Sequence, residues 1–188
     1  MNIRIYPGMN CHGLEFFLLD NEFKIIQNGS VKNFNEIPYQ VSQLLEEHIA
    51  NHSEIENALT EMHPNSRIKR IEQFAKCRFG GLDFQPDIKD NVLQDGEYWP
   101  CPNHGFCKHE GILCKLPIIN GQRLNMNEVK LIQLSATNKT NEVIAEEMNL
   151  ALGTFHQLKK YLHEKVAVQT KQELTKIGIR FSLIWSKD

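Results

Sequence analysis

Four cysteines in the middle of the chain have the residue type and the number that a tetrahedral metal site requires. They are Cys77, Cys101, Cys107 and Cys114, with 23, 5 and 6 residues between them. Four thiolates saturate the coordination of Zn²⁺, and such a site contributes about 10–16 kcal/mol of folding free energy in small peptides. We therefore predict a metal site formed by these four cysteines, with zinc as the first candidate.

The spacing of the cysteines leaves the identity of the metal open. Paired zinc ligands usually lie about two to four residues apart, and the gaps of five and six residues in this chain are wider. The wider gaps resemble the three-cysteine loops of iron–sulfur regulators, so an iron–sulfur cluster is the alternative. His104 and His109 could each replace a cysteine as a ligand. A third interpretation is that the thiols are buried and inert, and we interpret Cys11 and His12 as unrelated to the site.

The segment that carries three of the cysteines has a composition that does not fold readily by itself. Residues 78–123 hold six glycines and four prolines and show no sustained hydrophobic period. Irregular segments of this length are uncommon in compact domains, because they bury too little apolar surface to offset the entropy of ordering them. A bound metal would supply the missing stabilisation, which agrees with the prediction from the cysteines.

The residues before this segment predict an α+β domain. Apolar runs at Leu14–Leu19 and Phe23–Gln27 flank Asp20-Asn21, which is typical of a β-hairpin. Hydrophobic spacing then predicts three helices: near residues 39–50, from Ser53 to just before Pro64, and over residues 66–77. The stretch Ser53–Glu56 has the pattern of a capping box at the start of the second helix. We expect an N-terminal α+β domain over 1–77, a loop-rich cysteine segment over 78–120 packed on it, and a helical domain over 121–188.

The final third of the chain predicts four short helices. Apolar residues recur at helical spacing after Leu124, and Thr170–Glu173 has the pattern of a second capping box. The stretch "LNMNEVKLIQLSATNKTNEVIAEEMNLALGTFHQLKKYLHEKVAVQTKQEL", from Leu124 to Leu174, resembles the LuxR-type helix-turn-helix domain without a gap. The resemblance extends over about residues 120–186, and the matching residues are Leu124, Glu128, Ile132, Ala136, Asn141, Ile144, Ala145, Thr154, Lys165, Val168 and Thr170.

The resemblance implies a DNA-binding function and a set of contact residues. The scaffold helix would be Asn141–Met148, and the recognition helix, about Leu152–Val166, would lie in the major groove. The last helix would form a homodimer, so the implied partners are double-stranded DNA and a second copy of the chain. The residues that would contact DNA are Thr140, Asn141, Thr154, His156, Gln157, Lys159 and Lys160.

Three positions depart from the family pattern. Ala151 stands where a Ser usually caps the recognition helix, and alanine cannot accept the N–H groups at the helix start. Gly153 stands where a basic residue is common, and Glu142 places a negative charge beside an expected phosphate. These departures predict weak DNA affinity or a contact set that differs from the family's.

The distribution of charge agrees with a nucleic-acid partner for the final third. Residues 1–123 carry 12 basic and 16 acidic side chains, whereas residues 124–188 carry 9 basic and 7 acidic ones. Residues 154–171 form a basic stripe, because they include only one acidic residue, Glu164, and four lysines: Lys159, Lys160, Lys165 and Lys171.

We predict a transcription regulator and not an enzyme, because the chain has no phosphate-binding glycine loop, zinc-protease motif or nucleophile elbow. The alternative is a protein-interaction adaptor that uses the helix-turn-helix fold without binding DNA. No apolar run is long enough to cross a bilayer, and the first ten residues lack the apolar core of a secretion signal. We therefore expect a cytoplasmic location with no membrane partner.

Overall fold

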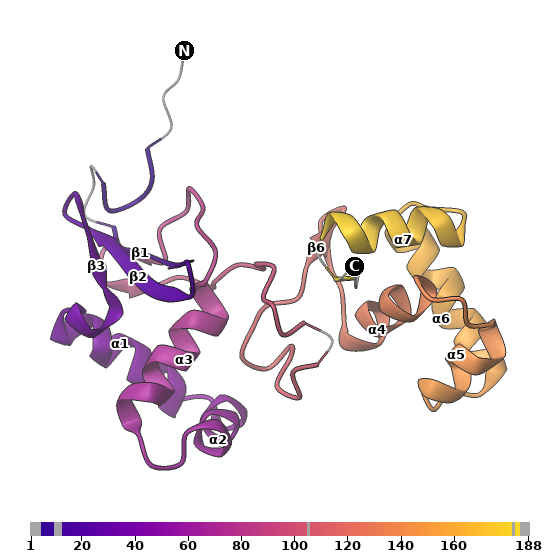
Figure 1. Cartoon of the computed structure of the whole chain (residues 1–188), viewed down its shortest axis with the longest axis horizontal. Helices are drawn as coiled ribbons and strands as arrows, with labels where there is room; N and C mark the ends of the chain where they lie inside the picture. Colours follow the sequence, from indigo (N-terminus) through magenta and orange to yellow (C-terminus); the bar gives the residue numbers. More distant parts are fainter. Residues whose placement is uncertain (1–4, 10–12, 105, 182, 185–188) are drawn as a thin grey trace. The chain divides into compact units, whose positions relative to one another are not determined.

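The computed structural model describes residues 5–9, 13–104, 106–181 and 183–184, which form two compact units (Figure 1). The first unit comprises Met1–Cys101 and Ile112–Lys115, and the second comprises Pro102–Gly111 and Leu116–Asp188. Over the described ranges the chain forms seven α-helices and three small antiparallel sheets, which confirms the α+β class. The residues of the predicted loop-rich segment, 78–120, are divided between the two units.

The first unit begins with a three-stranded antiparallel sheet of β1 (Glu15–Leu19), β2 (Glu22–Gln27) and β3 (Ser30–Asn33). The predicted hairpin between the first two strands is confirmed. Asp20 and Asn21 form its turn with φ of 50° and 65°, the left-handed values that a two-residue type I′ turn requires. The third strand extends this hairpin, and all four of its residues are exposed.

Three helices follow the sheet: α1 (Tyr39–Ala50), α2 (Ser53–Met62) and α3 (Arg67–Phe79), close to the predicted ranges. The predicted capping box at Ser53 is wrong. His52 is the N-cap residue, without a side-chain bond, and Ser53 is already the first helical residue. The sheet lies against the helices (Figure 1), and the core between them includes Phe16, Ile25, Leu45, Leu59, Phe74 and Phe79.

The cysteine-rich segment has apolar anchors that the sequence argument missed. It contributes the short strands β4 (Ile88–Lys89) and β5 (Val92–Leu93) to the first unit. Ile88 and Leu113 belong to the core of that unit, and Trp99 is also buried. The premise that this segment lacks buried apolar surface is therefore wrong, because a few well-separated anchors produce no periodic pattern.

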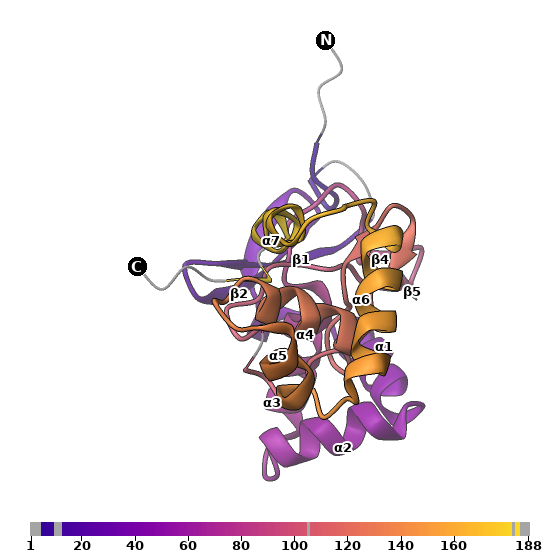
Figure 2. The same ribbon diagram turned by 90° about the vertical axis from the view of Figure 1, so that its right-hand side faces the viewer.

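After residues 102–111, the second unit continues with a short hairpin and four helices, and Figure 2 shows these helices, α4 to α7. The hairpin strands are β6 (Ile118–Ile119) and β7 (Gln122–Arg123), and the helices are α4 (Met126–Ser135), α5 (Asn141–Glu147), α6 (Leu152–Lys165) and α7 (Lys171–Arg180). Helix α4 contacts each of the other three helices, and α5 packs on α6. The predicted capping box at Thr170 is confirmed, since its side chain accepts from the backbone of Glu173.

A tight turn connects α5 to α6. Asn149 adopts a left-handed φ of 55°, and the N–H of Leu150 donates to the carbonyl of Ala145 at 2.9 Å. This bond closes the end of α5 in the manner of a Schellman motif, for which asparagine is a common residue. The turn sets the angle between the two helices that the sequence predicted as scaffold and recognition helix.

Within the ranges that the structure describes, no helix has the length and apolar character needed to span a lipid bilayer.

Candidate nucleic-acid interface

Helix α6 is fixed to the second unit by its buried face and by one ion pair at its end. Phe155 and Leu162, seven residues apart, are fully buried. At the end of the helix, the Nζ of Lys165 lies 2.7 Å and 2.9 Å from the two carboxylate oxygens of Glu128 and donates to the carbonyl of Arg123 at 2.9 Å. The two charged side chains are only 10% and 3% exposed. Glu128 also accepts from the N–H of Asn125, so one carboxylate both caps α4 and holds α6.

The start of α6 agrees with the predicted register. Ala151 is the N-cap residue, with φ −59° and ψ 143°, and no side chain accepts a hydrogen bond there. The backbone N–H groups in the first turn of the helix are therefore not capped by a side chain at this position. Gly153 has open space where a side chain would begin, so the helix start is unobstructed.

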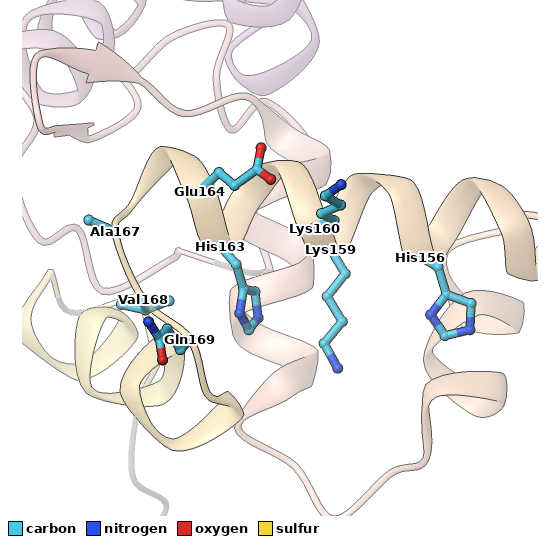
Figure 3. Close-up of a pocket in the computed structure, with 8 residues that line it drawn as sticks. All are labelled: His156, Lys159, Lys160, His163, Glu164, Ala167, Val168 and Gln169. Carbon is cyan, nitrogen blue, oxygen red and sulfur yellow. The ribbon is translucent and has the colours of Figure 1, made fainter.

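Four predicted DNA-contact residues lie on the outward face of α6. Thr154, His156, Gln157 and Lys160 are all exposed. Three of the predicted residues, His156, Lys159 and Lys160, line an open groove of about 780 Å³ beside the helix (Figure 3). The groove is bounded by His156, Lys159, Lys160, His163, Glu164, Ala167, Val168 and Gln169.

Three nitrogen-bearing side chains project from the same side of α6 into this region. They are His156, Lys159 and His163, and Figure 3 shows them below the helix, with Glu164 on its opposite side. His163 was missing from the predicted contact residues, although its spacing of seven residues from His156 places both on one helical stripe. Gln169 follows the helix and was also missed, because a helical period does not extend into a turn.

His163 contributes little positive charge to the groove. Burial lowers the pKa of its imidazole, and the nearby charge of Lys159 lowers it further. Its Nε2 atom is buried without a hydrogen-bond partner. Two lysines, Lys159 and Lys160, line the groove together with one acid, Glu164.

The start of α5 is already occupied by internal hydrogen bonds. The amide oxygen of Asn141 accepts from the Nζ of Lys159 at 3.2 Å, which ties α5 to α6. The carboxylate of Glu142 accepts from its own backbone N–H and from the hydroxyl of Thr140; both bonds lower its pKa, as does the charge of His156 to a smaller extent. Thr140, Asn141 and Lys159, which were predicted to contact DNA, thus bind protein atoms through their polar groups.

The cysteines predicted to bind metal are divided between the two units. Cys77, Cys101 and Cys114 belong to the first unit, and Cys107 belongs to the second. Among the residues with described positions, no three His, Cys, Asp or Glu side chains are grouped so that they could hold a metal ion. Cys11 and His12 lie outside the described residues.

Hydrogen bonds nevertheless tie together the chain segments that carry the three cysteines of the first unit. The indole N–H of Trp99 donates to the carbonyl of Cys77 at 3.2 Å. Arg78 donates to the carbonyls of Leu113 and Ile112 at 3.0 Å and 3.1 Å, which holds the residues next to Cys114 against α3. These bonds place each cysteine within two residues of a contact between segments.

In the second unit, the loop around Cys107 contains a buried polar pair. His104 Nδ1 lies 2.9 Å from Glu110 Oε1, and these side chains are 1% and 3% exposed. The N–H of Cys107 donates to the carbonyl of Asn103 at 2.9 Å. His104, which was considered as a substitute ligand, thus binds a carboxylate through one ring nitrogen.

Comparison of the chain with models of known protein families, with curated proteins and with solved structures finds no match, so the candidate interface is defined by the geometry of this chain alone.

Proposed function

We propose that the chain is a cytoplasmic DNA-binding transcription regulator that inserts α6 into the major groove of double-stranded DNA. One observation carries this proposal: α6 packs on the second unit through its buried side chains, while polar and basic side chains are exposed on its outward face. Phe155 and Leu162 fix the helix, and Thr154, Gln157 and Lys160 remain exposed. A helix of 14 residues with such a face matches the way in which recognition helices read base edges.

The exposed side chains divide into base-reading and phosphate-binding groups by their chemistry. Gln157 can pair with both the N6 and N7 positions of adenine. Lys160 is a mobile point charge suited to a phosphate, and Thr154 can donate its hydroxyl near the helix start. Thr140 and Asn141 would contact a phosphate only after Glu142 and Lys159 release them, so we assign them a weaker part in binding.

A bound metal is the second part of the proposal. We assign Cys77, Cys101, Cys107 and Cys114 as the ligands, with zinc preferred over an iron–sulfur cluster. The bonds from Trp99 and Arg78 support this assignment, because they gather three of the cysteine-bearing segments in the first unit. We expect one metal per chain.

The adaptor function remains the second candidate, and a specific feature of α6 favours it. Tyr161 and Leu152 on this helix are 65% and 43% exposed. Large apolar side chains on an outward face are typical of surfaces that bind another protein. For the same reason we propose that the chain dimerises through α7, where Ile179 is 61% exposed.

A pair of lysine substitutions in the full chain tests the DNA-binding proposal. Lys160→Ala removes an exposed charge from α6, and Lys69→Ala removes an exposed charge from α3 of the other unit as a matched control. Binding to a duplex of mixed sequence is measured by fluorescence anisotropy at low salt. We expect Lys160→Ala to weaken binding to all sequences and Lys69→Ala to have no effect. Equal affinity of the two variants would contradict the assignment of α6.

A further inference from the structure

Three carboxyl groups that are far apart in the sequence meet on one side of the first unit. Glu15 lies on β1, Asp87 immediately precedes β4, and Glu97 follows the β4–β5 hairpin. Glu15 and Asp87 are 1% and 3% exposed. Each would carry a negative charge in water near neutral pH, and burying an isolated carboxylate is strongly unfavourable.

The carboxyl groups join the segment after α3 to β1. Asp87 Oδ2 accepts from the N–H of Phe16 at 2.7 Å, and Glu15 Oε1 accepts from the N–H of Asp83 at 2.9 Å. Glu97 Oε1 accepts from the N–H of Gly81 at 3.2 Å. An antiparallel bridge between Leu14 and Ile88 adds two backbone bonds of 3.0 Å and 3.1 Å beside them. We refer to these contacts of Glu15, Asp87 and Glu97 as the carboxyl clasp.

Two features indicate that the clasp holds protons. Glu15 and Asp87 are almost completely buried and interact electrostatically, so two negative charges there would be unfavourable. The second oxygen of Glu15, Oε2, is buried without a hydrogen-bond partner, and a lone carboxylate oxygen in that position would be costly if charged. A protonated carboxyl group removes both difficulties.

The charged groups around the clasp are mainly acidic. Asp83 acts on all three carboxyls, and they also act on one another. Lys89 and Asp95 line the adjoining hollow of about 340 Å³ together with Asp83, Asp87 and Glu97. The neighbouring charges on α3 and β2 have partners of their own, since Arg78 binds the carbonyls of Ile112 and Leu113, and Lys24 pairs with Glu22 at 2.7 Å.

We propose that the carboxyl clasp is a pH-sensitive contact. It holds residues 81–97 on β1 while its carboxyl groups are protonated, and the contact weakens when these groups release their protons to solvent. The three negative charges created by this release would repel one another in a buried site. The backbone N–H groups of Phe16, Asp83 and Gly81 would then exchange their carboxyl partners for water. The inference concerns the first unit alone and does not depend on DNA binding by the second.

The direction of the pH effect follows from the raised pKa of these groups. Burial, together with the neighbouring acids Asp83 and Glu97, raises the pKa of Glu15 from 4.5 to about 8, although hydrogen bonds from backbone N–H groups oppose the shift. Burial and the acids Glu15, Glu97 and Asp83 raise the pKa of Asp87, and burial and Asp83 raise the pKa of Glu97. The folded state therefore binds more protons than the unfolded state, and stability falls as the pH rises from the unfolded pKa toward the folded one. Each carboxyl contributes up to about a tenfold change in the folding equilibrium per pH unit over that range.

Amide hydrogen exchange of the full chain tests the clasp. Protection factors, corrected for intrinsic exchange, are measured for peptides covering residues 13–19 and 80–97 at about pH 6 and about pH 9. The wild-type chain should lose protection in both peptides at the higher pH by at least tenfold. The triple variant Glu15→Gln, Asp87→Asn, Glu97→Gln, which carries neutral analogues of the protonated groups, should lose much less.

One control variant and two contrary outcomes complete the exchange experiment. Glu47→Gln, an exposed substitution on α1, should behave like the wild type. Unchanged protection of the wild-type chain between the two pH values would overturn the proposal, and this measurement does not depend on whether the triple variant folds. Restoration of protection at the higher pH by Ca²⁺ would also overturn it, because the cluster would then be a cation site and not a proton-held clasp.

Discussion

Replacing Lys165 by methionine tests whether the ion pair with Glu128 holds α6 in place. The substitution keeps the length and much of the packing of the side chain but removes its charge, leaving the carboxylate of Glu128 buried at 3% exposure. Breaking a buried ion pair by removing one partner costs about 3–5 kcal/mol. We expect the lower end, about 3 kcal/mol, because Glu128 keeps its bond from the N–H of Asn125. That loss corresponds to a change of about 100-fold in the folding equilibrium.

Urea unfolding followed by far-ultraviolet circular dichroism measures this loss in the free energy of unfolding. Two further variants show whether the loss comes from the ion pair. Lys160→Met is the matched control on the exposed face of the same helix and should change stability by less than about 0.5 kcal/mol. The double variant Glu128→Gln, Lys165→Met removes both charges while the glutamine oxygen can still accept from Asn125. It should recover at least about 1 kcal/mol relative to the single variant. If Lys165→Met costs no more than Lys160→Met, the ion pair does not anchor α6 and our reasoning about the interface is wrong.

The remaining predictions concern the helix start and the metal. Ala151→Ser should supply the missing side-chain acceptor at the N-cap of α6. In thermal unfolding it should stabilise the second unit by about 1 kcal/mol, and DNA binding should be equal or stronger. Destabilisation would show that residue 151 is not the N-cap. Elemental analysis of freshly purified, reduced protein should find about one zinc per chain, whereas a brown, air-sensitive colour would indicate the iron–sulfur alternative. Protein with neither metal would eliminate the proposed cysteine site.

The helices could be predicted well because their signals are local. Val41, Leu45 and Ile49 are buried at a spacing of four residues, and α1 has the predicted bounds. The start of α6 after Ala151 was also predictable from the ungapped resemblance. The capping box at Ser53 failed because the S-x-x-E pattern occurs one residue too late: His52 has the extended backbone of the cap. Sequence patterns locate a helix better than they locate its first residue.

Contacts between distant residues could not be predicted from the sequence. The carboxyl clasp brings Glu15 and Asp87 together through bonds from the backbone of Asp83 and Phe16, and no local pattern marks acids so far apart in the sequence as neighbours. Strand β3 has four exposed residues and hence no alternation of apolar and polar positions. Ala167 ends α6 with a left-handed φ of 56°, a conformation that alanine rarely adopts and that its residue type does not predict. Nor does any local pattern predict that Thr140 binds Glu142 and that Asn141 binds Lys159, although both were predicted to contact phosphate.

The salt dependence of duplex DNA binding by the full chain tests the central claim most directly. Each phosphate that a protein neutralises contributes about −0.9 to the slope of log affinity against log salt concentration. The wild-type chain should bind a mixed-sequence duplex at low salt with a steep negative slope, and Lys160→Ala should make that slope less negative by about one unit. Absence of duplex binding at low salt, or a slope near zero, would contradict the DNA-binding account and favour an adaptor that uses α6 to bind a protein.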